Sequence, residues 1–190
     1  QMCIRDSDLD GTAKNEVELI TRYREMAMQP EVESAVDDIV NEAIVHGDNG
    51  ESVEIVMDDL PQPEKIKNAI KAEFDTILRL LNFDNMGTDI FRRYYIDGRL
   101  YYHMILDVEN PQKGIQELRY IDPRKIRKVR EVKKQKDPNT GMEVVTMVAE
   151  YFVYSDRVST GPMTSAVAGV RIAPDSIINI NSGLMDAKRG

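Results

Sequence analysis

Residue types that build catalytic and metal centres are scarce in this sequence. One cysteine, Cys3, and two histidines, His46 and His103, occur in 190 residues. A single cysteine excludes an internal disulfide and a cysteine-based zinc site, and it favours a reducing compartment. His46 is expected at a helix C-terminus and His103 in an apolar strand. For both, a structural role is therefore favoured over a metal or catalytic role.

Motifs for cofactors and activated nucleophiles are missing as well. The sequence contains no G-x-x-x-x-G-K-[ST], which excludes a P-loop, and no G-x-S-x-G nucleophile turn. The acid pairs Asp37–Asp38 and Asp58–Asp59 lack the alternating spacing of a calcium loop and are better explained as solvated surface acids. We predict no enzymatic activity, no cofactor and no metal. An enzyme with an unrecognised carboxylate site is a minor alternative, since the acids form no constellation.

Long apolar runs are absent too. No segment approaches the roughly 20 residues that span a membrane, and no signal peptide is visible. Hydrophobic residues make up 42% and charged residues 31%, which indicates a globular chain. The net charge of -8 argues against a surface that binds nucleic acid throughout. From the ends QMCIRDS and LMDAKRG we expect an artefactual or disordered leader over residues 1–15 and a truncated end over residues 185–190.

Hydrophobic periodicity predicts a mainly helical part over residues 16–98. Apolar residues recur every three or four positions, as on the buried face of an amphipathic helix. Pro30 suits the start of the second helix and Gly47 its C-terminal cap. A turn is expected over residues 82–87, and a short strand over residues 52–58, where apolar and polar residues alternate. The expected helices span residues 16–28, 30–46, 64–81 and 89–97.

From residue 99 to residue 184 the sequence is extended in character, with many β-branched and aromatic residues. The segment DPNTG, residues 137–141, lies between two such runs and predicts a β-hairpin. The expected strands cover residues 99–108, 114–121, 126–135, 142–155, 169–174 and 176–181. Helices first and strands second predict an α+β fold, in which amphipathic helices precede an antiparallel, hairpin-rich β region.

A dense basic segment lies within this acidic chain. Residues 119–136 hold nine lysines and arginines against two acids. Such a patch attracts phosphate without sequence specificity, so one hypothesis is a stand-alone nucleic-acid-binding α+β module. We favour the other interpretation, a strand with one solvated face, because Val and Ile interrupt the charges and lysines protect sheet edges from aggregation. The candidate contact residues are Arg119, Arg124, Lys125, Arg127, Lys128 and Arg130.

The run FRRYYIDGRLYYH, residues 91–103, is a second candidate surface. Interleaved aromatic and basic side chains can stack on single-stranded nucleic acid. The helix and strand periodicities, however, place Phe91, Tyr94 and Tyr102 on the buried side. Core packing is therefore the favoured interpretation of this run.

Three segments together resemble one protein family. They are YREMAMQPEVESAVDDIVNEAIVHGD, DIFRRYYIDGRLYYHMILDVENPQKGIQELRYIDPRKIRKVREV and EYFVYSD. In this combination and order they resemble the portal vertex proteins of contractile-tailed, T-even-like bacteriophages and their cyanophage relatives. The resemblance covers residues 18–184, and the family pattern has no catalytic residues to carry over.

The resemblance implies a structural subunit in a ring of twelve at one capsid vertex of the virion. Such a ring is expected to nucleate head assembly in the host cytoplasm and to dock the terminase large subunit. It would pass double-stranded DNA in packaging and ejection, and contact major capsid, scaffold and neck proteins. This chain would supply part of the peripheral wing, with a helical part over 16–98 and a β-rich part over 99–184. There, the basic residues are expected to meet acidic faces of a neighbouring subunit or of the capsid rather than DNA.

Overall fold

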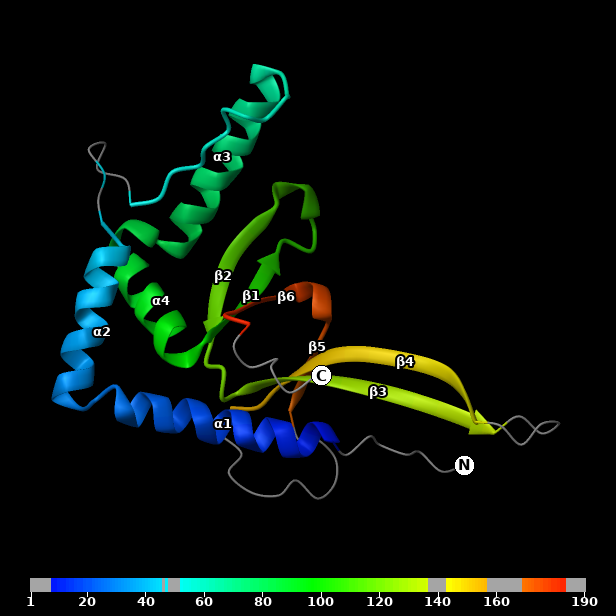
Figure 1. The fold of residues 1–190 in the computed structure, drawn as a ribbon. Coiled ribbons are helices and arrows are strands. Elements are labelled where there is room, and N and C mark those ends of the chain that lie inside the picture. Colours follow the sequence, from blue (N-terminus) through cyan, green and yellow to red (C-terminus); the bar gives the residue numbers. More distant parts are fainter. Residues whose placement is uncertain (1–7, 46, 48–51, 137–142, 157–168, 184–190) are drawn as a thin grey trace.

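The computed structural model describes residues 8–45, 47, 52–136, 143–156 and 169–183. In these residues four α-helices precede six strands along the chain (Figure 1). The helices are α1 (Asp8–Met26), α2 (Pro30–Ala43), α3 (Glu64–Leu81) and α4 (Phe83–Asp97). The strands are β1 (Arg99–Leu106), β2 (Ile115–Ile121), β3 (Ile126–Lys136), β4 (Glu143–Tyr154), β5 (Val170–Ile172) and β6 (Ile177–Asn181). This order confirms the predicted α+β class.

α1 and α2 differ from their expected bounds. α1 begins at Asp8 rather than Glu16 and ends at Met26 rather than Met28. α2 ends at Ala43, and Ile44 leaves the helical backbone while its N–H still bonds the carbonyl of Val40. Apolar periodicity continues past this point in the sequence, but Val45 is 59% exposed, and packing supplies most of the stability of a helix in a protein.

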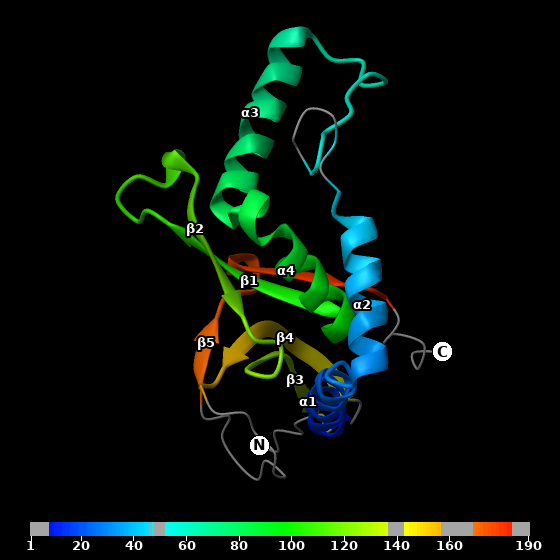
Figure 2. The same ribbon diagram turned by 90° about the vertical axis from the view of Figure 1, so that its left-hand side faces the viewer.

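A single residue, Asn82, forms the turn that was expected over residues 82–87. Asn82 adopts a left-handed conformation, with φ 49° and ψ 46°, and both α3 and α4 are capped by it. Asparagine tolerates this conformation better than most residues, so one residue suffices to redirect the chain. α4 therefore starts at Phe83, six residues before the expected position. Figure 2 shows α3 extending from this break, with its far end beyond both sheets.

The strand expected over residues 52–58 is not formed. The alternation of exposure is present, since Val53, Ile55 and Met57 are half-buried and Val56 is 77% exposed. No strand within the described ranges pairs with this segment. Alternation of apolar and polar residues indicates which face of a segment is covered. A strand also needs a neighbouring strand for its backbone hydrogen bonds.

The six strands form two antiparallel, three-stranded sheets, ordered β2-β1-β6 and β3-β4-β5. The predicted hairpin is confirmed by the pairing of β3 with β4, although its turn at 137–141 lies outside the described residues. A core of five residues joins the two sheets: Tyr101, Ile121, Ile126, Phe152 and Ile177. The rings of Tyr101 and Phe152 meet edge to face at 6.1 Å between centroids.

The strand part of the aromatic run at 91–103 belongs to this packed interior, whereas Phe91 and Tyr94 of α4 are half-buried and Tyr95 is 48% exposed. Tyr101 and Tyr102 are both buried, and because neighbouring strand residues point to opposite faces, β1 is covered on both sides. Tyr102 packs edge to face on Tyr120 of β2. Core packing is thus the better account of these tyrosines. His103 lies in β1 opposite Arg119 and Ile177, while His46 and Cys3 lie outside the described residues.

Candidate functional site

Arg24 is the centre of a charged junction between the helices and the sheets. It lies on the same side as Ile20 of α1 and as Ala27, which directly follows this helix; both are buried, so the Arg24 side chain is directed inward. Its Nε and Nη2 donate to the two carboxylate oxygens of Asp97 at 2.8 and 2.6 Å. Its Nη1 donates to Asp122 at 3.0 Å. This two-pronged arginine–carboxylate geometry is the strongest form of ion pair in proteins.

Asp97 requires such a partner for two reasons. It is the last residue of α4 and only 3% exposed. A carboxylate at a helix C-terminus faces the negative end of the dipole, and a buried charge without a partner is strongly destabilising. Arg24 satisfies both requirements. The following residue, Gly98, takes a φ of 69° and turns the chain directly into β1, which places Asp97 at the start of the sheet.

Asp122 connects the same arginine to the corner between β2 and β3. It accepts the backbone N–H of Arg124 at 2.9 Å and the Arg124 guanidinium at 2.8 Å. Burial alone would raise the pKa of Asp122, but the hydrogen bonds from Arg124 and the charge of Arg24 lower it to about 2. The hydrogen bonds that Arg24 donates to Asp97 hold the pKa of Arg24 above its usual value. The junction therefore links α1, α4 and the corner between β2 and β3 through charged side chains.

Acid is expected to weaken this junction in a defined pH window. The pKa of Asp122 is about 2 in the folded protein against an ordinary value of 3.8. Its contribution to stability is therefore complete above about pH 4 and is lost as the pH falls through about 2. Because Asp122 is only partly buried, screening by solvent limits the loss to about 1 kcal/mol.

Urea unfolding of the chain and of Asp122→Asn at about pH 5 and about pH 2.5 measures this loss. The chain should lose about 1 kcal/mol more than the variant over this interval. Equal losses in the two proteins would show that Asp122 does not carry the effect.

A groove of about 540 Å³ opens beside the junction, between α1, α2, α4 and the end of β2. Ala27, Met28 and Ile96 give it an apolar lining. Its polar lining consists of Arg24, Glu33, Arg92, Arg93, Asp97, Tyr120 and Asp122. The arginines and carboxylates of this set are equal in number, so the groove has no net charge of its own.

The three arginines of the groove differ in their partners. Arg24 is paired as described, and Arg92 pairs with Asp37 and, at 3.8 Å, with Glu33. Arg93 instead stacks over the ring of Tyr120, with its guanidinium carbon 4.9 Å from the ring centroid. Within the described part of the chain, no carboxylate lies at ion-pair distance from Arg93. Its charge is therefore available to an acidic group from outside.

The basic residues singled out in the sequence are mostly paired with acids of the same chain. The pairs with N···O distances are Arg119–Glu117 at 3.0 Å, Arg124–Asp122 at 2.8 Å, Lys125–Asp156 at 3.0 Å, Lys128–Glu150 at 2.8 Å and Arg130–Glu150 at 3.7 Å. Arg127 is half-buried and also has an interaction partner. Arg124 joins the junction, whereas the others are distributed along β2, β3 and their connection. A contact role for this set stays a prediction.

The amino-acid sequence matches one known family. The family model described as Bacteriophage T4-like portal protein (Gp20) matches residues 16–190. The chain belongs to the T4-like portal protein family. It is 40% identical over 185 residues to the portal protein of Vibrio phage KVP40, which covers 95% of this chain and 35% of the relative. It is 31% identical over 147 residues to the portal protein of Salmonella phage ViI, which covers 77% of this chain and 26% of the relative.

The chain thus spans about a third of the length of the KVP40 portal protein and about a quarter of the ViI protein. In the described residues of this portal-family chain, no three His, Cys, Asp or Glu side chains gather as they would around a metal ion. None of the described helices is long and apolar enough to cross a membrane.

The junction was missed in the sequence, although two local signals point to it. Arg24 is a charge on the apolar stripe of its helix, and Asp97 is an acid where the helix dipole favours a base. Both anomalies call for a partner of opposite charge. Their pairing could not be inferred, since Arg24 lies 73 residues from Asp97 and 98 from Asp122. Arg99, which is buried, was missed for the same reason, and it pairs with Glu16 of α1 at 3.0 Å.

Proposed function

We propose that this chain is part of a structural subunit of a phage portal ring, the conduit through which double-stranded DNA is packaged and ejected. The family match over residues 16–190 is the observation that carries the proposal. The helical part, 16–98, and the β-rich part, 99–184, would together form the peripheral wing of the subunit. The site of action would be the portal vertex of the virion, reached by assembly in the host cytoplasm.

The described charges support a structural role over an enzymatic one. The strongest ion pairs join elements of the fold to each other, as Arg24 does for α1, α4 and the β2–β3 corner. Carboxylates held by arginines are poorly suited to general acid–base chemistry, which needs a pKa near the working pH. The proposed partners are eleven further copies of the subunit, the major capsid and scaffold proteins, the terminase large subunit and the neck proteins.

The stand-alone nucleic-acid-binding module is not favoured. Binding to phosphate depends on basic side chains whose charge is not already neutralised, and most of the candidate residues in 119–136 are paired with Glu117, Asp122, Glu150 or Asp156. A net charge of -8 further reduces attraction to DNA. For a conduit this is an advantage, because DNA must pass without being held.

A segment exchange tests the proposal. The region of the KVP40 portal protein that matches this chain is replaced by residues 16–190, and the chimera is examined by negative-stain electron microscopy and analytical ultracentrifugation. Closed rings are expected, because the exchanged segment is proposed to be the equivalent wing. The same chimera with Arg24→Ala is the control and should yield fewer rings, since its wing is less stable. A chimera that folds by circular dichroism but stays monomeric would contradict the proposal.

A further inference from the structure

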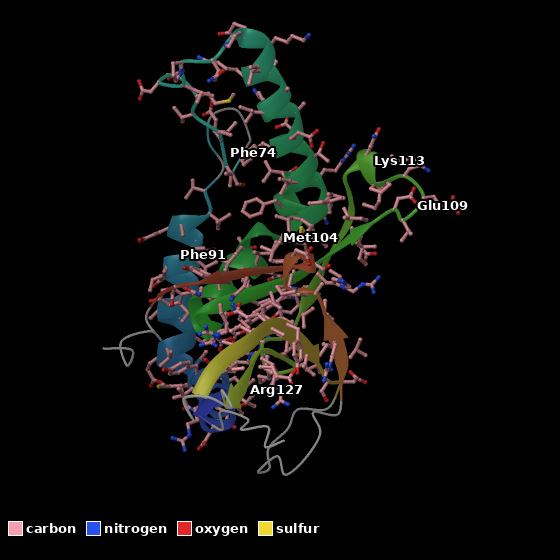
Figure 3. All side chains as sticks on the ribbon, turned by 90° about the vertical axis from the view of Figure 1, so that its right-hand side faces the viewer. Phe74, Phe91, Met104, Glu109, Lys113 and Arg127 are labelled. Carbon is pink, nitrogen blue, oxygen red and sulfur yellow. The ribbon has the colours of Figure 1, made fainter. Side chains whose placement is uncertain are left out.

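The turn between β1 and β2 presents an acidic and apolar tip, residues 107–110. Val108 is 92% exposed, and the neighbouring Leu106 is 50% exposed. Glu109 is exposed and has no ion-pair partner among the described residues. Figure 3 shows Glu109 and Lys113 at the outer end of this turn, away from the core. Because Val108 buries almost no apolar surface and Glu109 has no ion-pair partner in the described residues, these two side chains contribute little to the stability of their own chain.

The tip is held in one conformation. Asp107 accepts the backbone N–H groups of Glu109 at 2.9 Å and of Asn110 at 3.3 Å, and its other oxygen contacts Lys113 at 3.3 Å. These interactions lower the pKa of Asp107, with the hydrogen bond from Glu109 as the largest cause. A preorganised turn loses little conformational entropy when it binds, which favours a role in recognition.

The groove beside the junction is chemically complementary to this tip. Arg93 supplies a positive charge without a carboxylate partner in the described residues, and Ala27, Met28 and Ile96 supply an apolar lining. A volume of about 540 Å³ is within the range of sites that enclose small ligands. The negative charge of Glu109 is complementary to the positive charge of Arg93, and the apolar side chain of Val108 is complementary to the apolar lining.

The tip lies before the start of β2, whereas Tyr120 of the groove lies near the end of this strand. Figure 1 shows the two ends of β2 well apart. Ile115 lies shortly after the tip in the sequence, and Tyr120 lines the groove. About 20 Å of strand therefore separates the tip from the groove within one chain. The tip therefore cannot fill the groove of its own subunit, whereas a neighbour placed head to tail can supply it. Contacts between two different surfaces of identical subunits generate rings when the rotation closes.

We propose that residues 107–110 of one copy of this chain insert into the groove of the next copy, with Glu109 on Arg93 and Val108 against Met28. The inference rests on the proposed ring and names one contact within it. DNA is the less suitable occupant of the groove. Arg93 offers a single free charge, whereas DNA binding relies on several phosphate contacts at once.

Disulfide trapping in the 190-residue chain tests the contact. Cys3→Ser removes the native thiol, and Val108→Cys and Met28→Cys are introduced in two separate preparations. The mixed preparations should form a Cys–Cys link between these positions under mild oxidation, measured by non-reducing electrophoresis and peptide mass spectrometry. Val56→Cys in place of Met28→Cys is the matched control, because the native side chains are similarly exposed, at 77% and 74%. Equal rates for the two pairs would overturn the proposal.

A charge exchange supplies the second arm of the test. Glu109→Arg in the Val108→Cys chain, or Arg93→Glu in the Met28→Cys chain, should slow the link about fivefold. Combining the two should restore the rate, since the charges are opposite again. No slowing by either change, or no recovery in the combination, would also overturn the contact. Ring formation by the KVP40 chimera is measured separately, so rings without this link would refute the contact and leave the proposed function intact.

Discussion

Replacing Arg24 with alanine is expected to lower the free energy of unfolding by about 3 kcal/mol. The change removes the partner of Asp97, whose side chain is 1% exposed, and leaves a buried charge at the negative end of a helix dipole. Asp122 loses one of its two arginines in the same step. Equilibrium urea unfolding of the 190-residue chain at neutral pH measures the effect.

Arg22→Ala is the matched control for this prediction. Arg22 lies on the same helix and pairs with Glu18 four residues earlier, but both side chains are well exposed. Its loss should cost less than about 0.5 kcal/mol. Exchanging both partners of the pair, as in Arg24→Met with Asp97→Asn, should recover part of the stability because Asp97 no longer leaves an unpaired buried charge. If Arg24→Ala cost no more than Arg22→Ala, the junction would not stabilise the fold.

Truncation of Phe152 to alanine is expected to cost about 3 to 4 kcal/mol. Phe152 is 4% exposed and lies in the core that joins the two sheets, against Tyr101 of β1. The substitution removes buried apolar surface and leaves a cavity that neighbours on two different sheets cannot readily fill. Thermal or urea unfolding provides the measurement, and Phe152→Leu, which keeps most of the volume, should cost only about 1 kcal/mol.

A double-mutant cycle with Tyr101→Ala tests whether the sheets share one core. The two substitutions should couple by about 1 kcal/mol, because the aromatic pair is lost in either single variant. Strictly additive losses, or a two-step unfolding curve, would instead indicate sheets that fold independently.

The helices and strands were largely predictable because each depends on a short stretch of sequence. The spacing of Val36 and Val40 shows which face of α2 is buried, and Gly98 marks the end of α4. The order of these elements was enough for the α+β class. The one-residue break at Asn82 was not predictable, since its left-handed conformation replaces what looked like a six-residue turn.

The strand expected over residues 52–58 failed for a different reason. Pairing is a property of two segments, and no alternation within one segment reveals whether a partner exists. The same limit applies to the junction and the groove. Arg24, Asp97 and Asp122 each appear as a local anomaly or as an ordinary surface acid, and only the fold shows that they meet. Arg93 likewise became notable only once Tyr120 was placed beneath it.

The link between α3 and α4 makes α3 a lever arm. Its 18 residues are about 27 Å long, and one residue, Asn82, connects it to the helix that carries Asp97. Each degree of rotation at Asn82 therefore moves the far end of α3 by about 0.5 Å. Ile66 and Ile70, which are 44% and 37% exposed, lie toward that far end. A change at this one residue would thus be amplified into a displacement of the apolar surface that α3 carries, opposed by the packing of α3 on β2 and α4.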